Sequence, residues 1–193
     1  GELTMRQLDV SRHGVRSGYP SVVMKMLLAE LHPGLPLTDM PRLLENRFEA
    51  ARNTDDPALL YATGAFLRNA EDGAINFVSA GHQPLLLCRA DGSVERLEAT
   101  GMPVALISGS SWEEESTRLA EGDSLLLFSD GLVELRNDAG EEVGEDRVAE
   151  VLRRGGPAPE IAQNLLRAFE QFHDLDRLDD DLSLIVLQRR APR

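Results

Sequence analysis

Apolar residues recur at the spacing of one helix face in four stretches of the chain. These stretches run from about Gly18 to His32, from Thr38 or Asp39 to about Ala51, from Glu145 to Leu152 and from Glu160 to Phe172. The segment Pro33-Gly34-Leu35-Pro36 ends the first of them, and Thr38 or Asp39 can cap the second. The pattern therefore predicts two helices in the first third of the chain and two near its end.

Between these helices the chain changes to short apolar runs separated by turn residues. We expect strands at Leu59–Leu67, Ile75–Ser79, Pro84–Cys88 and Val94–Leu97, with Asp72-Gly73 and Asp91-Gly92 at hairpin positions. A further strand pair brackets Glu121-Gly122-Asp123, and its second member, Leu125–Phe128, is a continuous apolar run typical of a buried central strand. Strands are also predicted at Leu3–Asp9 and at Leu182–Leu187.

The order of these elements favours one fold class. Helices come early, antiparallel hairpins occupy the middle, and helices with a strand return late, which fits an α+β layered domain better than a regular βαβ alternation. At 193 residues the chain is long enough for one domain with its own core. No internal repeat or linker divides it, so we expect a single domain over residues 1–193.

Composition and charge exclude several classes of function. Hydrophobic residues make up 42% of the chain and charged residues 27%, as in an ordinary soluble globular protein. A formal net charge of −13 argues against binding to nucleic acid or to acidic membranes. Cys88 is the single cysteine, which predicts no intrachain disulfide and favours a reducing cytoplasm. No apolar run approaches the roughly 20 residues that a membrane span requires.

Three aspartate positions stand at the ends of predicted strands. Asp9 ends the first strand, Asp130 follows the apolar run that ends at Phe128, and Asp179-Asp180-Asp181 directly precedes the last strand. Carboxylates that converge at one sheet edge repel one another unless a cation neutralises them, and hard divalent cations are the usual partners. Two such cations about 3.5–4 Å apart could activate a water for in-line attack on a phosphate ester. Spacing alone leaves a structural role for each aspartate open, because turns also favour these residues.

Four segments in order carry a resemblance to a known family. They are Leu8-Asp9-Val10-Ser11-Arg12-His13-Gly14, Val78-Ser79-Ala80-Gly81-His82-Gln83-Pro84, Leu126-Leu127-Phe128-Ser129-Asp130-Gly131-Leu132-Val133-Glu134 and Asp180-Asp181-Leu182-Ser183-Leu184-Ile185-Val186. Together they resemble the signatures of the SpoIIE-like bacterial branch of the PPM (type 2C) protein phosphatases. The resemblance implies a central antiparallel β-sandwich with helices on both outer faces and a metal site at one end of the sandwich.

The resemblance also implies roles for particular residues. Asp9 matches the aspartate that bridges two Mn2+ or Mg2+ ions, and the carbonyl of Val10 matches a backbone ligand. Asp130 matches the metal aspartate of the Asp-Gly motif. Asp180 matches the last metal aspartate, with Asp181 as the alternative.

Two histidines lie within these motifs. His13, close in sequence to the predicted metal ligands, could transfer a proton to the leaving seryl oxygen. His82 lies in a turn that the resemblance places between hairpin strands, and a histidine flanked by turn residues is more often a scaffold than a catalyst.

The chain departs from the family pattern at two places. Arg12 stands where the family carries glycine, and a bulky cation there could alter the backbone, repel a metal or bind the substrate phosphate. The family also places another metal aspartate, in a Gly-Asp motif, one hairpin before the Asp9 strand. Only eight residues precede Asp9 and Glu2 is the sole acid among them. We therefore expect an N-terminally incomplete domain whose first hairpin is absent from this chain.

These observations lead to one functional expectation and two rivals. The resemblance implies a phosphatase acting through a metal-activated water on phosphoserine or phosphothreonine of a bacterial regulatory protein, of the type that antagonises anti-sigma factors. It also implies an upstream receiver or sensor domain in the same protein, as in two-component signalling, and a homodimer is one assembly such a domain could form. The first rival is a degenerate phosphatase domain that acts as a protein-binding adaptor in sigma-factor or two-component signalling. The second is a calcium-binding or purely structural α+β domain.

Overall fold

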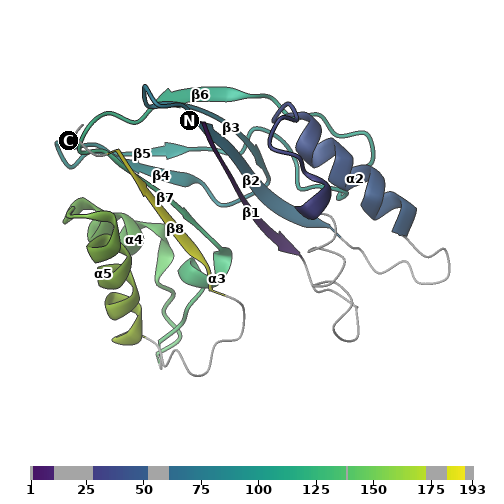
Figure 1. Ribbon diagram of the computed structural model, residues 1–193. Coiled ribbons are helices and arrows are strands. Elements are labelled where there is room, and N and C mark those ends of the chain that lie inside the picture. The colour runs from purple at the N-terminus through teal and green to yellow at the C-terminus, as the bar shows by residue number, and fades with distance from the viewer. Residues whose placement is uncertain (1, 11–27, 52–60, 138, 173–181, 190–193) are drawn as a thin grey trace. The chain divides into compact units, whose positions relative to one another are not determined.

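The computed structural model describes residues 2–10, 28–51, 61–137, 139–172 and 182–189 (Figure 1). These residues fall into two compact units. The first unit comprises Gly1–His82 and Ala99–Thr117, and the second comprises Gln83–Glu98 and Arg118–Arg193. Each unit has its own sheet and its own hydrophobic core, and each is described by itself.

The first unit is built on a four-stranded antiparallel sheet with the strand order β1-β2-β3-β6. Its elements are β1 (Leu3–Val10), α2 (Asp39–Ala51), β2 (Ala62–Asn69), β3 (Ala74–Ala80) and β6 (Glu115–Arg118). Strand β1 pairs with β2 along its whole length, from Leu3 opposite Asn69 to Val10 opposite Ala62. Since β1 is an edge strand, its C-terminal residues stand at one corner of this sheet.

Helix α2 covers one face of this sheet because its apolar residues are four positions apart. Met40, Leu44 and Phe48 are almost fully buried and belong to one cluster with Phe66 of β2 and Val78 of β3. Residues at positions i, i+4 and i+8 share one side of a helix, so the sequence pattern alone explains the stripe that packs on the sheet.

The second unit is built on another four-stranded antiparallel sheet, with the order β5-β4-β7-β8. Its elements are β4 (Leu85–Cys88), β5 (Val94–Leu97), β7 (Ser124–Phe128), α3 (Asp130–Val133), α4 (Gly144–Arg153), α5 (Ala158–Glu170) and β8 (Leu184–Gln188). Helices α4 and α5 pack on one face of this sheet (Figure 1). All five residues of β7 are buried, and the strand lies between β4 and β8.

Gln188, at the C-terminal end of β8, connects the sheet of the second unit to its helices. Its side-chain nitrogen donates to Ser124 Oγ at 3.3 Å and to Gly156 O at 3.0 Å. Its side-chain oxygen accepts from Ala158 N at 3.1 Å, which satisfies a backbone donor at the start of α5. One amide side chain thereby fixes the loop between α4 and α5 against the strand pair β7–β8.

Most of the elements predicted from sequence are confirmed, and two connections were predicted wrongly. The strands on either side of Glu121-Gly122-Asp123 are not a pair: β6 pairs with β3 in the first sheet, whereas β7 lies in the second. The turn around His82 likewise joins β3 to β4, which lie in different sheets, so it is not a hairpin turn. Composition explains the first case, because β6 is short and mostly exposed, as suits an edge, whereas the wholly apolar β7 needs a neighbour on each side.

The first predicted helix falls largely on residues that the structure does not describe, and its last described residues, 28–30, are helical. No helix within the described ranges has the length and apolar character needed to cross a membrane.

Candidate functional site

Asp130 stands where β7 gives way to α3. Ser129 is still extended, with φ −77° and ψ 160°, and the chain becomes helical at Asp130. Asp130 Oδ1 accepts a hydrogen bond from Gly131 N at 2.9 Å, which fixes the orientation of the carboxylate. The side chain is half-buried, and within the described part of the chain no basic group is paired with it. A half-buried carboxylate that lacks a counter-charge is suited to bind a cation.

The start of β8 is held beside Asp130. Ser129 N donates to Ser183 O at 3.0 Å, and Ser183 N donates to Ser129 Oγ at 2.9 Å. The residue directly before Asp130 is therefore tied by two hydrogen bonds to the residue two positions after Asp181. The sequence predicted a role for Asp130 and none for Ser129, although a hydroxyl residue at the end of a buried strand can indicate a side chain that bonds a neighbouring strand.

Asp9 and Val10 are the last two residues of β1 in the first unit, and both are half-buried. Val10 packs with Leu8 against the α2 cluster, so Asp9, on the alternate face of the strand, lies on the side of the sheet away from α2. Ala62, opposite Val10, donates its N–H to Val104 O at 3.0 Å and accepts from Val104 N at 2.7 Å. The carbonyl of Val10 consequently receives no hydrogen bond from Ala62 and is suited to the backbone-ligand role predicted for it.

The remaining predicted site residues lie outside the described residues. These are His13, Asp180 and Asp181, together with Arg12, which departs from the family pattern. Asp9 and Asp130 belong to different units. Within the described ranges no group of three or more histidine, cysteine, aspartate or glutamate side chains could hold a metal ion. The complete ligand set predicted from sequence includes residues outside these ranges.

His82 occupies the connection between β3 and β4 and is buried, with 4% of its surface exposed. The preceding Gly81 has φ +61°, and a Cβ at that position would approach the ring of Pro103 to 2.4 Å. Only glycine fits both the conformation and the space. Burial in so constrained a connection agrees with the scaffold role predicted for His82.

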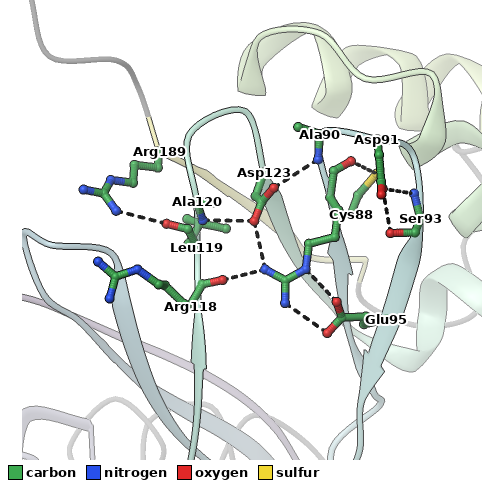
Figure 2. Close-up of polar contacts among 11 residues, drawn as sticks. Cys88, Ala90, Asp91, Ser93, Glu95, Arg118, Leu119, Ala120, Asp123 and Arg189 are labelled. Atoms are coloured by element: carbon green, nitrogen blue, oxygen red, sulfur yellow. Dashed lines mark hydrogen bonds and ion pairs between the residues drawn. The ribbon is translucent and has the colours of Figure 1, made fainter.

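Asp123, at the other end of β7, has its charge matched inside the protein (Figure 2). The side chain is 3% exposed. Its Oδ2 accepts from Arg89 Nη1 and from Ala120 N, both at 2.9 Å, and its Oδ1 accepts from Ala90 N at 3.0 Å. Three donors therefore converge on one buried carboxylate.

Arg89 links this carboxylate to two further acceptors. Its Nε and Nη2 donate to the two carboxylate oxygens of Glu95 at 2.6 and 3.0 Å, and its Nη1 also donates to Arg118 O at 2.6 Å. We call Arg89, Glu95 and Asp123, with the backbone groups they bind, the Arg89–Asp123 clasp. The clasp joins strands β4 and β5 to the turn before β7.

The pKa shifts in the clasp follow from these contacts. Burial by itself raises the pKa of Asp123, but the hydrogen bonds from Arg89, Ala120 and Ala90 outweigh it, so the pKa of this carboxyl lies below its ordinary value. The hydrogen bond from Arg89 lowers the pKa of Glu95, and the same bond raises the pKa of Arg89. All three groups are held in their charged forms, as in a structural ion-pair network.

Comparison with known proteins identifies the family. The family described as Stage II sporulation protein E (SpoIIE) matches residues 3–190. The chain belongs to the SpoIIE family. Phosphoserine phosphatase RsbU of Bacillus subtilis (strain 168) is 30% identical to it over 118 residues, which are 60% of this chain and 35% of RsbU. The chain spans an even smaller part, 19%, of another relative, protein IcfG of Synechocystis sp. (strain PCC 6803).

Solved structures have the same fold as this SpoIIE-family chain. The RsbU and RsbW domains of Rv1364c from Mycobacterium tuberculosis match with a TM-score of 0.77 and 25% identity over all of this chain and 53% of that one. The PP2C phosphatase domain of SpoIIE from Bacillus subtilis, solved with a fragment of its regulatory domain, matches with a TM-score of 0.74 and 19% identity. That match covers 99% of this chain and 56% of the other. The predicted family and fold class, a PPM phosphatase fold with two antiparallel sheets and flanking helices, are thereby confirmed.

Proposed function

We propose that this chain is the catalytic domain of a metal-dependent protein phosphatase that removes phosphate from serine or threonine of a bacterial regulatory protein. The proposal rests on the environment of the Asp130 carboxylate in a chain that belongs to the SpoIIE family. This carboxylate is half-buried, oriented by Gly131, and has no basic partner within the described ranges. A half-buried carboxylate without a basic partner is suited to bind a divalent cation.

The residues that would hold the metal are those assigned from the sequence. They are the carboxylates of Asp9, Asp130 and Asp180, with Asp181 in reserve, and the carbonyl of Val10, and the ions would be two Mn2+ or Mg2+. When bound, such a pair supplies a water activated for in-line attack on a phosphate ester. The carbonyl of Val10, which receives no hydrogen bond from Ala62, and the carboxylate of Asp130 would supply hard oxygen ligands of the kind that these ions prefer.

Proton transfer is assigned to His13. Cleavage of a phosphoserine leaves a seryl oxygen that needs a proton, and a histidine close in sequence to Asp9 is suited to provide one near neutral pH. Arg12, its neighbour, is a candidate to bind the substrate phosphate through its guanidinium group.

The proposed substrate is a phosphorylated protein of the type that antagonises an anti-sigma factor. The relative named phosphoserine phosphatase RsbU and the structure that contains RsbU and RsbW domains support this choice. We further propose that the domain operates in the cytoplasm, is controlled by a receiver or sensor domain in the same protein and can form a homodimer. Residues 1–193 would form one phosphatase domain.

The competing function is an adaptor that has the phosphatase fold and has lost catalysis. Arg12, standing where the family carries glycine, favours this alternative, since a cation at that position could repel a metal. An adaptor would still bind its regulatory partner.

The test is the release of phosphate from a phosphoserine protein, or from p-nitrophenyl phosphate, by the full-length protein with and without Mn2+. We expect turnover that requires Mn2+ and disappears in Asp130→Asn. Absence of turnover in the full-length protein, or an active protein in which Asp130→Asn has no effect, would contradict the proposal. Binding of a regulatory protein without turnover and without Mn2+ binding would favour the adaptor.

A further inference from the structure

The pairing of β7 with β8 continues one step beyond the two strands. The regular ladder ends with Phe128 opposite Leu184. The next opposite residues are Ser129 and Ser183, and Ser129 N still donates to Ser183 O at 3.0 Å. In a regular antiparallel ladder, the return bond of such a pair runs from Ser183 N to the carbonyl of Ser129.

Ser183 N does not make that return bond, because the carbonyl of Ser129, although the residue itself is extended, is directed into the first turn of α3. This carbonyl accepts from Leu132 N at 3.1 Å, which is the first turn of the helix. The hydroxyl takes its place: Ser183 N donates to Ser129 Oγ at 2.9 Å. Serine before a helix commonly caps that helix with its own side chain, but Ser129 makes no such bond.

Because the hydroxyl replaces the carbonyl as the acceptor of Ser183 N, Ser129 contributes both to the start of α3 and to the pairing of β8 with β7. The carbonyl of Ser129 starts the helix that carries Asp130, while the hydroxyl keeps the beginning of β8 paired. Ser129 is 5% exposed, so its hydroxyl lies inside the protein, whereas its partner Ser183 is exposed. An alanine would leave Ser183 N without this acceptor, so that one of the two bonds between residues 129 and 183 is lost while the backbone bond to Ser183 O remains.

We propose that Ser129 is a positioning residue of the metal site: its hydroxyl, together with its backbone N–H, holds the start of β8 beside Asp130. The inference rests on the proposed metal-dependent phosphatase function, and it concerns how the ligand carboxylates are held, not which residues bind. Groups that orient metal ligands typically change metal affinity by about 10–100-fold when they are removed.

The same strand provides a matched control. Ser124, at the other end of β7, is 4% exposed, and its Oγ also accepts a bond from β8, from Gln188 Nε2 at 3.3 Å. Ser124→Ala and Ser129→Ala thus each remove one buried hydroxyl that links β7 to β8. Of the two residues, only Ser129 is next to Asp130 in the chain.

The experiment is calorimetric titration of Mn2+ into the full-length protein and into Ser129→Ala, Ser129→Thr and Ser124→Ala. We expect Ser129→Ala to weaken Mn2+ binding by about tenfold, while Ser129→Thr, which keeps the hydroxyl, and Ser124→Ala bind as the wild type does. Thermal melts of the metal-free proteins show whether the two alanine variants are folded. If Ser129→Ala does not fold, Ser129→Cys takes its place, because a thiol of similar size is a weak acceptor.

The titrations distinguish the positioning role of Ser129 from the proposed phosphatase function. Equal Mn2+ affinity of the wild type, the variant without the Ser129 hydroxyl and Ser124→Ala would overturn the positioning role and leave the proposed function standing. Loss of affinity in Ser124→Ala as large as that at Ser129 would also overturn it, since the effect would then be a general loosening of the strand pair. A wild-type protein that binds no Mn2+ would overturn the proposed function itself, and the positioning role with it.

Discussion

Asp123 and Asp130 flank the same buried strand, β7, and their environments differ. Asp123 is 3% exposed and accepts hydrogen bonds from three donors, one of which is the guanidinium of Arg89. Asp130 is half-buried, and the hydrogen bond to it within the described ranges comes from the uncharged N–H of Gly131. Within the described ranges, the first carboxylate has a basic partner and the second has none.

The difference shows how a structural aspartate can be separated from a candidate metal ligand. In the sequence the two look alike, since each stands beside a glycine at one end of the same apolar run, as Gly122-Asp123 and Asp130-Gly131. The deciding property is the charge of the partners, because a buried ion pair holds its carboxylate in place whereas an uncompensated carboxylate can gain stability from a metal. The comparison makes predictions for both residues.

The largest effect is expected at Asp130. Asp130→Asn keeps the shape of the side chain and an oxygen for Gly131 N, but it removes the charge. We expect Mn2+-dependent phosphatase activity to fall by more than about 100-fold, the upper end of what removal of a group that only supports a ligand causes. Without metal, the free energy of unfolding should stay within about 0.5 kcal/mol of the wild type, as for other substitutions that break no internal network. Steady-state phosphate release and urea unfolding measure the two quantities.

The opposite pattern is expected at Asp123. In Asp123→Asn the amide presents one NH2 group to a site where both oxygens accept from donors, so either Ala90 N or both Arg89 and Ala120 N face another donor. We expect a loss of about 2 kcal/mol in the free energy of unfolding and an unchanged affinity for Mn2+. Urea unfolding and calorimetry test this. A stable Asp123→Asn protein that has lost Mn2+ binding would reverse the comparison.

A smaller effect is expected at Arg89. Lysine can keep one bond to Asp123, but it cannot reproduce the fork that reaches Glu95 through two nitrogens and Arg118 O through a third. Glu95 is about half exposed, and bonds of this kind contribute little. We expect Arg89→Lys to cost about 1 kcal/mol, measured by urea unfolding beside Arg96→Lys, a control at the more exposed Arg96. Equal losses of unfolding free energy in Arg89→Lys and Arg96→Lys would show that the Arg89–Asp123 clasp stabilises the protein no more than the ion pairs of the more exposed Arg96 do.

The smallest effect concerns pH. The pKa of Asp123 is lower in the folded protein than in the unfolded chain, so its charged form contributes stability above the unfolded pKa of about 3.9. That contribution is lost as the pH falls through the folded pKa. The difference in unfolding free energy between the wild type and Asp123→Asn should therefore be constant from about pH 5 to pH 7 and shrink below about pH 4. A difference that grows on acidification would contradict the assignment of the shift.

Local elements were predictable from the sequence because they depend on neighbours along the chain. Strand β5 was predicted with its observed bounds, Val94–Leu97, and the apolar run of β7 correctly indicated a central strand. Helix α2 begins at Asp39, one of the two positions that the capping residues and the apolar spacing had indicated, and ends at Ala51 as predicted.

What could not be predicted depends on residues far apart in the sequence. Arg89 and Asp123 are 34 positions apart, and Ser129 and Ser183 are 54 apart, so no local pattern announces either contact. The pairing of β6 with β3 was missed for the same reason, since a turn signal shows that a chain reverses but not which strand becomes its neighbour. For the candidate site, the sequence supplied Asp9, Val10 and Asp130 through motif order, while the contrast between Asp130 and Asp123 required the structure.

The most direct test of the central claim is the shift in melting temperature that Mn2+ causes in the wild type, Asp123→Asn and Asp130→Asn. At a concentration of about 100 Kd, a ligand that binds only the folded state adds about 2.7 kcal/mol, which for a chain of this size corresponds to roughly 5–10 °C. We predict that Asp123→Asn melts lower than the wild type but keeps this shift, whereas Asp130→Asn melts near the metal-free wild type and shows none. A full shift in Asp130→Asn, or its loss in Asp123→Asn alone, would contradict the account.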